Sequence, residues 1–209
     1  MRTVLATLCC LWCLFPGVAL AQDAAAPLED RPGVKVNEVE HGIFFGVEAG
    51  GLFLFGPKAA PNAKTGFSPG GGFAFTLGGD IGDFLSIGLL VMGNTVNTPN
   101  GFASDGPSNM KGSFTALTLG GIVKVSPFGF KDSNDVKRAF VYARVGGGYS
   151  LMGPNNFYKD GDITVLGGVG LEYFTHLRHF SIGLTVDFFY GIQHMGAGLM
   201  LTPNLRYTF

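Results

Sequence analysis

Met195 to Phe209, the stretch MGAGLMLTPNLRYTF, ends the chain and decides its fold. Counted back from the last residue, alternate positions are apolar or aromatic (Phe209, Tyr207, Leu205, Pro203, Leu201, Leu199 and Ala197). The positions between them are mostly polar or small (Thr208, Arg206, Asn204, Thr202, Met200, Gly198 and Gly196). A period of two sends successive side chains to opposite faces of a β-strand. The stretch therefore predicts a terminal strand with one apolar face and one mixed face.

A chain that stops on Phe after such a pattern resembles the C-terminal strand of bacterial outer-membrane β-barrels. The resemblance implies that Leu205, Tyr207 and Phe209 form the signal that the outer-membrane assembly machinery recognises. It also implies that the protein is located in the outer membrane. Its partners would then include the assembly machinery and the lipids of that membrane.

The beginning of the chain predicts a signal peptide over residues 1–21. After a positive start, the apolar run Val4 to Val18 is too short to span a bilayer, and Ala19-Leu20-Ala21 supplies the small residues of a cleavage site. The alternative is an uncleaved membrane anchor, which Pro16-Gly17 disfavours because it breaks the segment. All the cysteines lie in this segment (Cys9, Cys10 and Cys13). The mature chain would therefore hold no disulfide, thiol nucleophile or thiolate metal site.

The composition indicates a membrane protein that does not cross the bilayer with helices. Hydrophobic residues make up 46% of the chain and charged residues 14%, yet beyond the signal peptide no run of about 18 apolar residues occurs. A barrel produces this combination because lipid-facing residues alternate with lumen-facing ones. Without Arg2, 13 of the 14 basic residues remain against 15 acidic ones, a net charge of −2 that argues against a nucleic-acid partner.

The same alternation recurs along residues 41–209 and predicts an all-β fold, an eight-stranded antiparallel up-and-down transmembrane β-barrel. The strands before the terminal one are His41–Phe55, Phe67–Asp80, Phe84–Met92, Ser113–Val125, Arg138–Leu151, Asp162–Phe174 and Phe180–Tyr190. Outer loops are expected at Gly56–Gly66, Gly93–Gly112, Met152–Gly161 and Gly191–Met195, and periplasmic turns at Gly79–Asp83, Ser126–Lys137 and Thr175–His179. Residues 22–40, rich in Ala, Pro and acidic side chains, are expected to form a flexible periplasmic segment.

The placement of the charges separates a membrane barrel from the alternative of a soluble, lipocalin-like barrel. The charged residues of the strand cores all fall on the mixed face, among glycines (Glu48, Lys124, Arg144, Glu172, Asp187 and Arg206). A soluble barrel would turn its polar face outward, and so few charges would make an unusual exterior. We therefore expect these acids and bases to pair inside the lumen and fill it, with glycines making room for Arg144 and Arg206. A filled lumen argues against a general-diffusion porin.

Aromatic residues collect near both ends of the predicted strands, as they do in the interfacial girdles of membrane barrels. One rim carries Phe53, Phe55, Phe67, Tyr149, Phe188 and Tyr190, and the other carries Tyr173, Phe180, Tyr207 and Phe209. This distribution favours an exterior in contact with lipid.

We predict no catalytic, cofactor-binding or metal site. Small outer-membrane barrels include lipid A-modifying enzymes, but His194 is the one histidine expected on the outer side, and nothing obliges Ser150 to face it. His176 and His179 could ligate a metal from a turn, but a third ligand is lacking. The loop Gly93–Gly112, rich in Asn, Gly, Ser, Thr and Pro, is the candidate contact surface because loops of this length are often functional.

Three stretches of the chain carry a more specific resemblance: HGIFFGVEAGGLFLFGPK (41–58), FTLGGDIGDFLSIGLLVMGNTVNTPNG (75–101) and FFYGIQHMGAGLMLTPNLRYTF (188–209). They are similar to the CglE-type adventurous gliding motility proteins of myxobacteria, which are small outer-membrane proteins. The resemblance implies a structural or adhesive role in a gliding apparatus, other motility proteins as partners, and transfer between touching cells. The alternatives are a generic OmpA/OmpX-like surface barrel and a lipid A-modifying enzyme.

Overall fold

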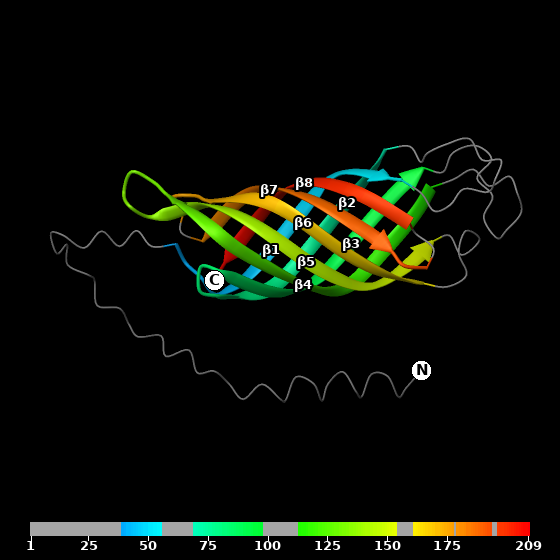
Figure 1. Ribbon diagram of the computed structural model, residues 1–209, viewed down its shortest axis with the longest axis horizontal. Coiled ribbons are helices and arrows are strands. Elements are labelled where there is room, and N and C mark those ends of the chain that lie inside the picture. Colours follow the sequence, from blue (N-terminus) through cyan, green and yellow to red (C-terminus); the bar gives the residue numbers. More distant parts are fainter. Residues whose placement is uncertain (1–38, 56–68, 98–112, 154–160, 178, 194–195) are drawn as a thin grey trace, which may run out of the picture. The chain divides into compact units, whose positions relative to one another are not determined.

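The computed structural model of the protein describes residues 39–55, 69–97, 113–153, 161–177, 179–193 and 196–209. They form eight antiparallel strands that close into a barrel in chain order, each pairing with the next and β1 with β8 (Figure 1). The strands are β1 (Ile43–Leu54), β2 (Gly70–Ile81), β3 (Leu85–Asn97), β4 (Ser113–Lys131), β5 (Lys137–Gly153), β6 (Asp162–Phe174), β7 (Phe180–Gly191) and β8 (Gly196–Thr208). The fold class predicted from the alternation is confirmed. Among the described residues, no helix is long and apolar enough to cross a bilayer.

The two ends of the barrel differ in their connections. Short turns join β2 to β3, β4 to β5 and β6 to β7 at the end that also carries the C-terminus (Figure 1). Gly82 and Asp135 hold positive φ angles of 63° and 64° in two of these turns. Outer-membrane barrels have short turns on the periplasmic side, so we name this the periplasmic end and the opposite one the outer end. The predicted signal peptide, most of the predicted 22–40 segment and the loop Gly56–Gly66 lie outside the described residues.

The predicted start of the outer loop Gly93–Gly112 is wrong because β3 runs further along the chain. The first five residues of the predicted loop Gly93–Gly112 belong to β3 and pair with β4, from Gly93 opposite Leu117 to Asn97 opposite Ser113. Strand pairing satisfies their backbone groups, which outweighs the turn propensity of Asn and Gly. Residues 98–112 of that loop lie outside the described residues.

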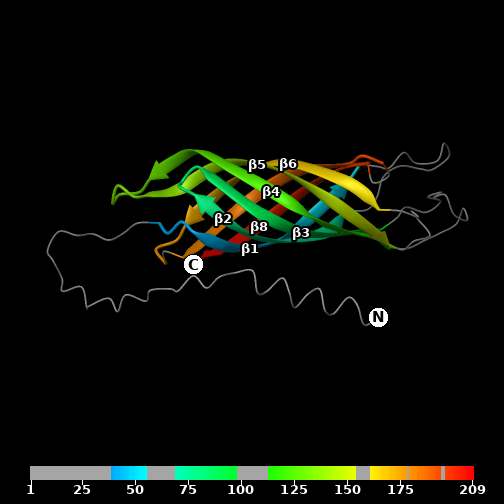
Figure 2. The same cartoon turned by 90° about the horizontal axis from the view of Figure 1, so that it is seen from below.

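The predicted periplasmic turn Ser126–Lys137 is also wrong, because β4 and β5 continue as a hairpin (Figure 2). A register shift between Val125 and Phe128 marks a β-bulge at this point. A bulge accommodates Pro127, which has no backbone N–H to contribute to the ladder. The turn itself is only Asp132–Val136, closed by a 2.8 Å hydrogen bond from the Asp132 N–H to the Val136 carbonyl.

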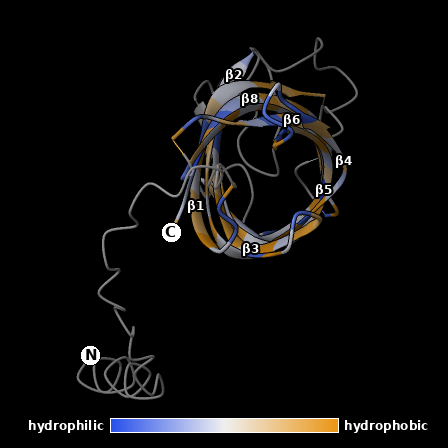
Figure 3. Cartoon of the chain, turned by 90° about the vertical axis from the view of Figure 1, so that its left-hand side faces the viewer, coloured by the Kyte–Doolittle hydropathy of each residue, from blue (hydrophilic) through white to orange (hydrophobic). Residues whose placement is uncertain are grey.

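The outer surface of the barrel is apolar, as the uniform face of each strand predicts. Strand residues of this face are strongly exposed, such as Leu89 at 67%, Val145 at 61% and Val169 at 60%. The strands close into a complete ring when viewed end-on (Figure 3). Exposed aliphatic side chains around a closed ring fit a hydrocarbon environment, because a closed barrel leaves no unpaired strand edge.

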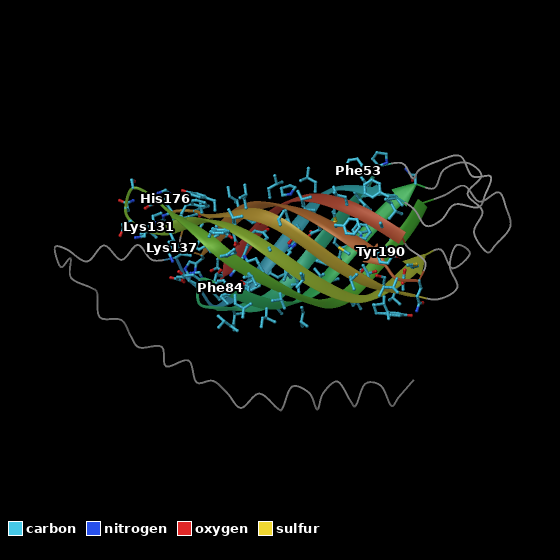
Figure 4. All side chains as sticks on the ribbon, viewed as in Figure 1. Phe53, Phe84, Lys131, Lys137, His176 and Tyr190 are labelled. Atoms are coloured by element: carbon cyan, nitrogen blue, oxygen red, sulfur yellow. The ribbon has the colours of Figure 1, made fainter. Side chains whose placement is uncertain are left out.

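Aromatic side chains mark both ends of this apolar surface. Phe53 and Tyr190 lie toward the outer end and Phe84 toward the periplasmic end (Figure 4). At the periplasmic end Tyr207 packs edge-on against Phe180 and Phe209, and its ring centroid lies 4.9 Å from the centroid of each. Predicted girdle residue Phe67 lies outside the described residues, whereas Phe84 adds to the periplasmic rim. Aromatic rings at these levels are typical of the two membrane–water interfaces.

Most apolar side chains of the lumen lie toward its outer end, together with the buried polar residues Thr118, Ser150, Asp162 and Thr164. The apolar cluster comprises Leu52, Leu54, Ala74, Leu90, Met92, Val96, Ala116, Ile122, Met152, Leu166, Phe189 and Met200. Many of its members, such as Leu54, Val96 and Met152, stand at the outer ends of their strands. The charged side chains described next lie nearer the periplasmic end, so side chains fill most of the lumen, as expected for eight strands.

Candidate functional site in the barrel lumen

The middle of the lumen is crossed by Arg144, which reaches from β5 to carboxylates on β1 and β7. Its Nη1 and Nη2 donate to the Glu48 carboxylate at 2.5 and 2.7 Å. Its Nε donates to Asp187 Oδ1 at 2.8 Å, and its Nη2 also contacts the other Asp187 oxygen. Thr202 on β8 donates a further hydrogen bond to Glu48 at 3.1 Å. The guanidinium is therefore held in a bidentate pair on each side, the strongest arrangement open to arginine.

A second group of charges lies on the periplasmic side of the first. Lys124 Nζ donates to Glu172 Oε2 at 2.5 Å, and the Ser181 hydroxyl donates to the other oxygen at 2.6 Å. Arg206 Nη1 lies 3.8 Å from Glu172 Oε1, so two cations share this carboxylate. Arg206 also forms an ion pair with Asp80. The structure thus brings all six charges expected from the sequence into the lumen, in two clusters.

Asp80 is the member of this network that the sequence pattern did not identify. It was expected where the strand Phe67–Asp80 meets the turn Gly79–Asp83, but the structure continues β2 to Ile81, and Asp80 accepts a 2.6 Å hydrogen bond from Ser86. The signal was present, because Asp80 continues the inward positions Ala74 and Thr76 at a spacing of two. The clusters therefore contain four carboxylates against three cations, with the His41 ring 3.8 Å from Asp80.

The lumen glycines make room for side chains other than the two arginines named from the sequence. A Cβ atom at Gly168 would lie 2.1 Å from Asp187 Oδ1, and one at Gly170 would lie 2.4 Å from the Tyr142 ring. The Tyr142 hydroxyl lies 2.5 Å from that of Thr185. The expectation that glycines make room for Arg144 and Arg206 is corrected: these glycines accommodate Asp187, the partner of Arg144, and the neighbouring Tyr142.

A cavity of about 50 Å³ separates the two charge clusters. Its lining includes Glu48, Lys124, Tyr142, Arg144, Glu172 and Arg206. A polar cavity of this size holds a few water molecules but no larger solute. Together with the apolar cluster toward the outer end, the network closes the lumen and leaves no porin-sized passage through the described residues.

Further polar contacts secure the periplasmic rim. The buried Arg138 donates to Asp132 at 2.9 Å and to the Thr175 carbonyl at 2.9 Å, which ties the β4–β5 hairpin to the next turn. Partial desolvation raises the pKa of Asp132, but hydrogen bonds from the backbone N–H groups of Asn134 and Val136 and from Arg138 outweigh it and hold that pKa below its usual value.

The histidines of this rim contact carboxylates. His41 Nε2 lies 3.2 Å from Asp83, and His179 Nδ1 lies 2.9 Å from Glu40. Lys131, Lys137 and His176 lie at the same end of the barrel (Figure 4). Within the described ranges, no three His, Cys, Asp or Glu side chains are grouped as metal ligands would be.

The geometry around Ser150 bears on the enzyme alternative. Its side chain is fully buried, and its hydroxyl lies 2.6 Å from that of Thr118 and 2.5 Å from that of Thr164. Neither threonine hydroxyl can act as a general base, so these contacts do not activate Ser150 as a nucleophile. His194, the histidine expected on the outer side, lies outside the described residues.

The C-terminal residues expected to form the assembly signal face the membrane side of β8. Leu205 is 49% exposed and Phe209 68% exposed, while Tyr207 packs between Phe180 and Phe209. Their recognition by the assembly machinery stays a prediction.

Deleting Phe209 should lower the amount of assembled barrel in the outer membrane while export across the inner membrane continues. The removed residue contributes an exposed ring and one backbone hydrogen bond, from its N–H to Ile43 at 2.8 Å, so little folding energy is lost. The measurement is heat-modifiable migration of outer-membrane fractions, with Phe209→Tyr as the matched control. Normal assembly of the truncated chain would contradict the assignment of the signal.

A closed antiparallel barrel with an apolar exterior, two aromatic girdles and its charges inside defines the chain as an outer-membrane β-barrel. The sequence matches no protein-family profile and no curated protein.

Solved structures with a similar fold come from several bacteria. Neisserial surface protein A is 14% identical, with a TM-score of 0.50 over 80% of this chain and 97% of that one. OprG from Pseudomonas aeruginosa is 13% identical, with a TM-score of 0.48 over 82% and 99%. Ail, the attachment invasion locus protein of Yersinia pestis, is 14% identical, with a TM-score of 0.39 over 81% and 99%. Likeness at these identities concerns the fold alone.

Proposed function

We propose that the protein is a non-enzymatic surface barrel that acts as a structural or adhesive component at the outer face of the cell. The observation that supports this role is the closed lumen, in which Arg144 is paired on both sides and most of the apolar cluster lies toward the outer end. A barrel with a closed lumen offers its loops and rims for contact with partners.

The more specific form of the proposal is a role in gliding motility. It is supported by the sequence resemblance of residues 41–58, 75–101 and 188–209 to CglE-type proteins. Other motility proteins would then be the partners, and the protein would pass between touching cells as an integral part of the outer membrane.

Deleting the gene should impair the gliding of single cells while leaving permeability to small antibiotics unchanged. Permeability serves as the control, because a lumen closed by ion pairs and apolar residues contributes no diffusion path. Contact with a wild-type donor should restore movement transiently if the protein is transferred. Normal gliding in the deletion strain would reject the motility role and leave the general surface barrel.

A further inference from the structure

The lipid-facing wall carries an apolar groove of about 640 Å³ near the periplasmic end. Outward side chains of β5 to β8 form most of it, with Phe130 of the β4–β5 hairpin at one edge. Its volume falls within the range of about 300–1,000 Å³ that is typical of small-molecule sites.

The strand register explains why a depression forms at this place. Ala139 on β5 pairs with Phe130 on β4 and with Tyr173 on β6. The two rings are 59% and 40% exposed, so a single methyl group lies between two projecting aromatic side chains. The surroundings of the next alanine on this face differ: four residues further along β5, Ala143 is flanked by the smaller side chains of Val125 and Val169.

The position of the groove identifies its occupant. It is continuous with the lipid-facing band, since its lining includes the exposed Ile182 and Leu184. Tyr173 belongs to the periplasmic girdle, so the groove opens at the level of the periplasmic leaflet. An empty depression in hydrocarbon would lose the dispersion contacts of every side chain that lines it.

We propose that this groove binds one acyl chain of a phospholipid of the periplasmic leaflet, and holds it longer than the rest of the wall holds its lipids. The chain lies over Ala139 between the rings of Phe130 and Tyr173. The Tyr173 hydroxyl stands at the interface, where it can donate to the polar part of the same lipid. This site depends on the fold of the wall and not on the motility role.

The experiment uses the mature barrel refolded into vesicles of phosphatidylethanolamine and phosphatidylglycerol that contain a trace of phosphatidylethanolamine with a photoreactive acyl chain. After irradiation, cross-linked peptides are mapped by mass spectrometry. We expect several-fold enrichment of cross-links on the residues that line the groove relative to the wall formed by β1 to β3. Ala139→Phe should reduce this enrichment to the level of that opposite wall.

Ala143→Phe is the matched control, because it adds the same ring to an outward position of the same strand, outside the groove. It should leave the cross-link map unchanged. Cross-links spread evenly around the wild-type barrel would overturn the proposal. Fewer cross-links in the groove than on the opposite wall would also overturn it, and would indicate that a second copy of the barrel covers the groove. The wild-type map decides the question even if Ala139→Phe fails to assemble.

Discussion

Replacing Arg144 with methionine should destabilise the barrel by about 3–5 kcal/mol, because the substitution removes the cation of a buried cluster and leaves its two carboxylates in place. Arg144 donates to Glu48 and Asp187, and each of the three residues is at most 7% exposed. Methionine is unbranched and shorter than arginine and has no donors, so two carboxylates would remain unpaired in the lumen. Taking a charge out of water without a partner carries a large free-energy cost.

The measurement is urea unfolding of the protein refolded into phospholipid vesicles, followed by the loss of heat-modifiable migration. Lys131→Met is the matched control, since Lys131 also forms an ion pair, with Asp135, but the two side chains are 53% and 83% exposed. An exposed pair contributes only about 0–1 kcal/mol, so this variant should unfold close to wild type.

A triple variant separates charge from packing. Glu48→Gln and Asp187→Asn, added to Arg144→Met, leave no unpaired charge in this cluster. Most of the lost stability should therefore return, because neutral replacement of a complete buried cluster is often nearly neutral in free energy. If the triple variant were as unstable as the single one, Arg144 would act through its shape. An unaltered single variant would contradict the structural role of the cluster.

The sequence predicted the faces of the strands because the side-chain period of a strand is directly visible. Arg144 and Val145 are neighbours in the chain, and the period alone places one in the lumen and the other in the lipid. The same rule, carried four residues beyond Thr76 along β2, would have placed Asp80 in the lumen. Its position beside Gly79 and Gly82 suggested a turn, and turn composition overrode the alternation at that strand end.

The ends of the strands and their pairing partners are harder to predict from the sequence, because they depend on the neighbouring strand. The bulge that lets β4 continue past Pro127 exists only because β5 supplies a partner ladder. Glu48 and Arg144 are 96 residues apart, and their contact depends on the closure of the barrel and its register. Nor does the sequence show that Ala139 lies between Phe130 and Tyr173, so the groove emerges only from the assembled wall.

Placing arginine at Val145 should have nearly as large an effect as removing it from the neighbouring position. Val145 is 61% exposed, lies near the middle of β5, and pairs with Val123 and Gly167 on the adjacent strands. An arginine on the lipid face of a barrel costs about 2–4 kcal/mol at the bilayer midplane. We expect Val145→Arg either to lose this much stability or to fail to assemble.

Val145→Leu is the matched control, since it changes size without adding charge and should unfold in vesicles as the wild-type protein does. The same urea titration measures both variants, and folding into detergent micelles tests whether Val145→Arg can still form the barrel where water reaches the wall more readily. Failure in vesicles with success in micelles would locate the cost in the hydrocarbon. Unaltered stability of Val145→Arg in vesicles would instead mean that this face does not contact lipid, and Arg144 and Val145 would have to exchange their assigned sides.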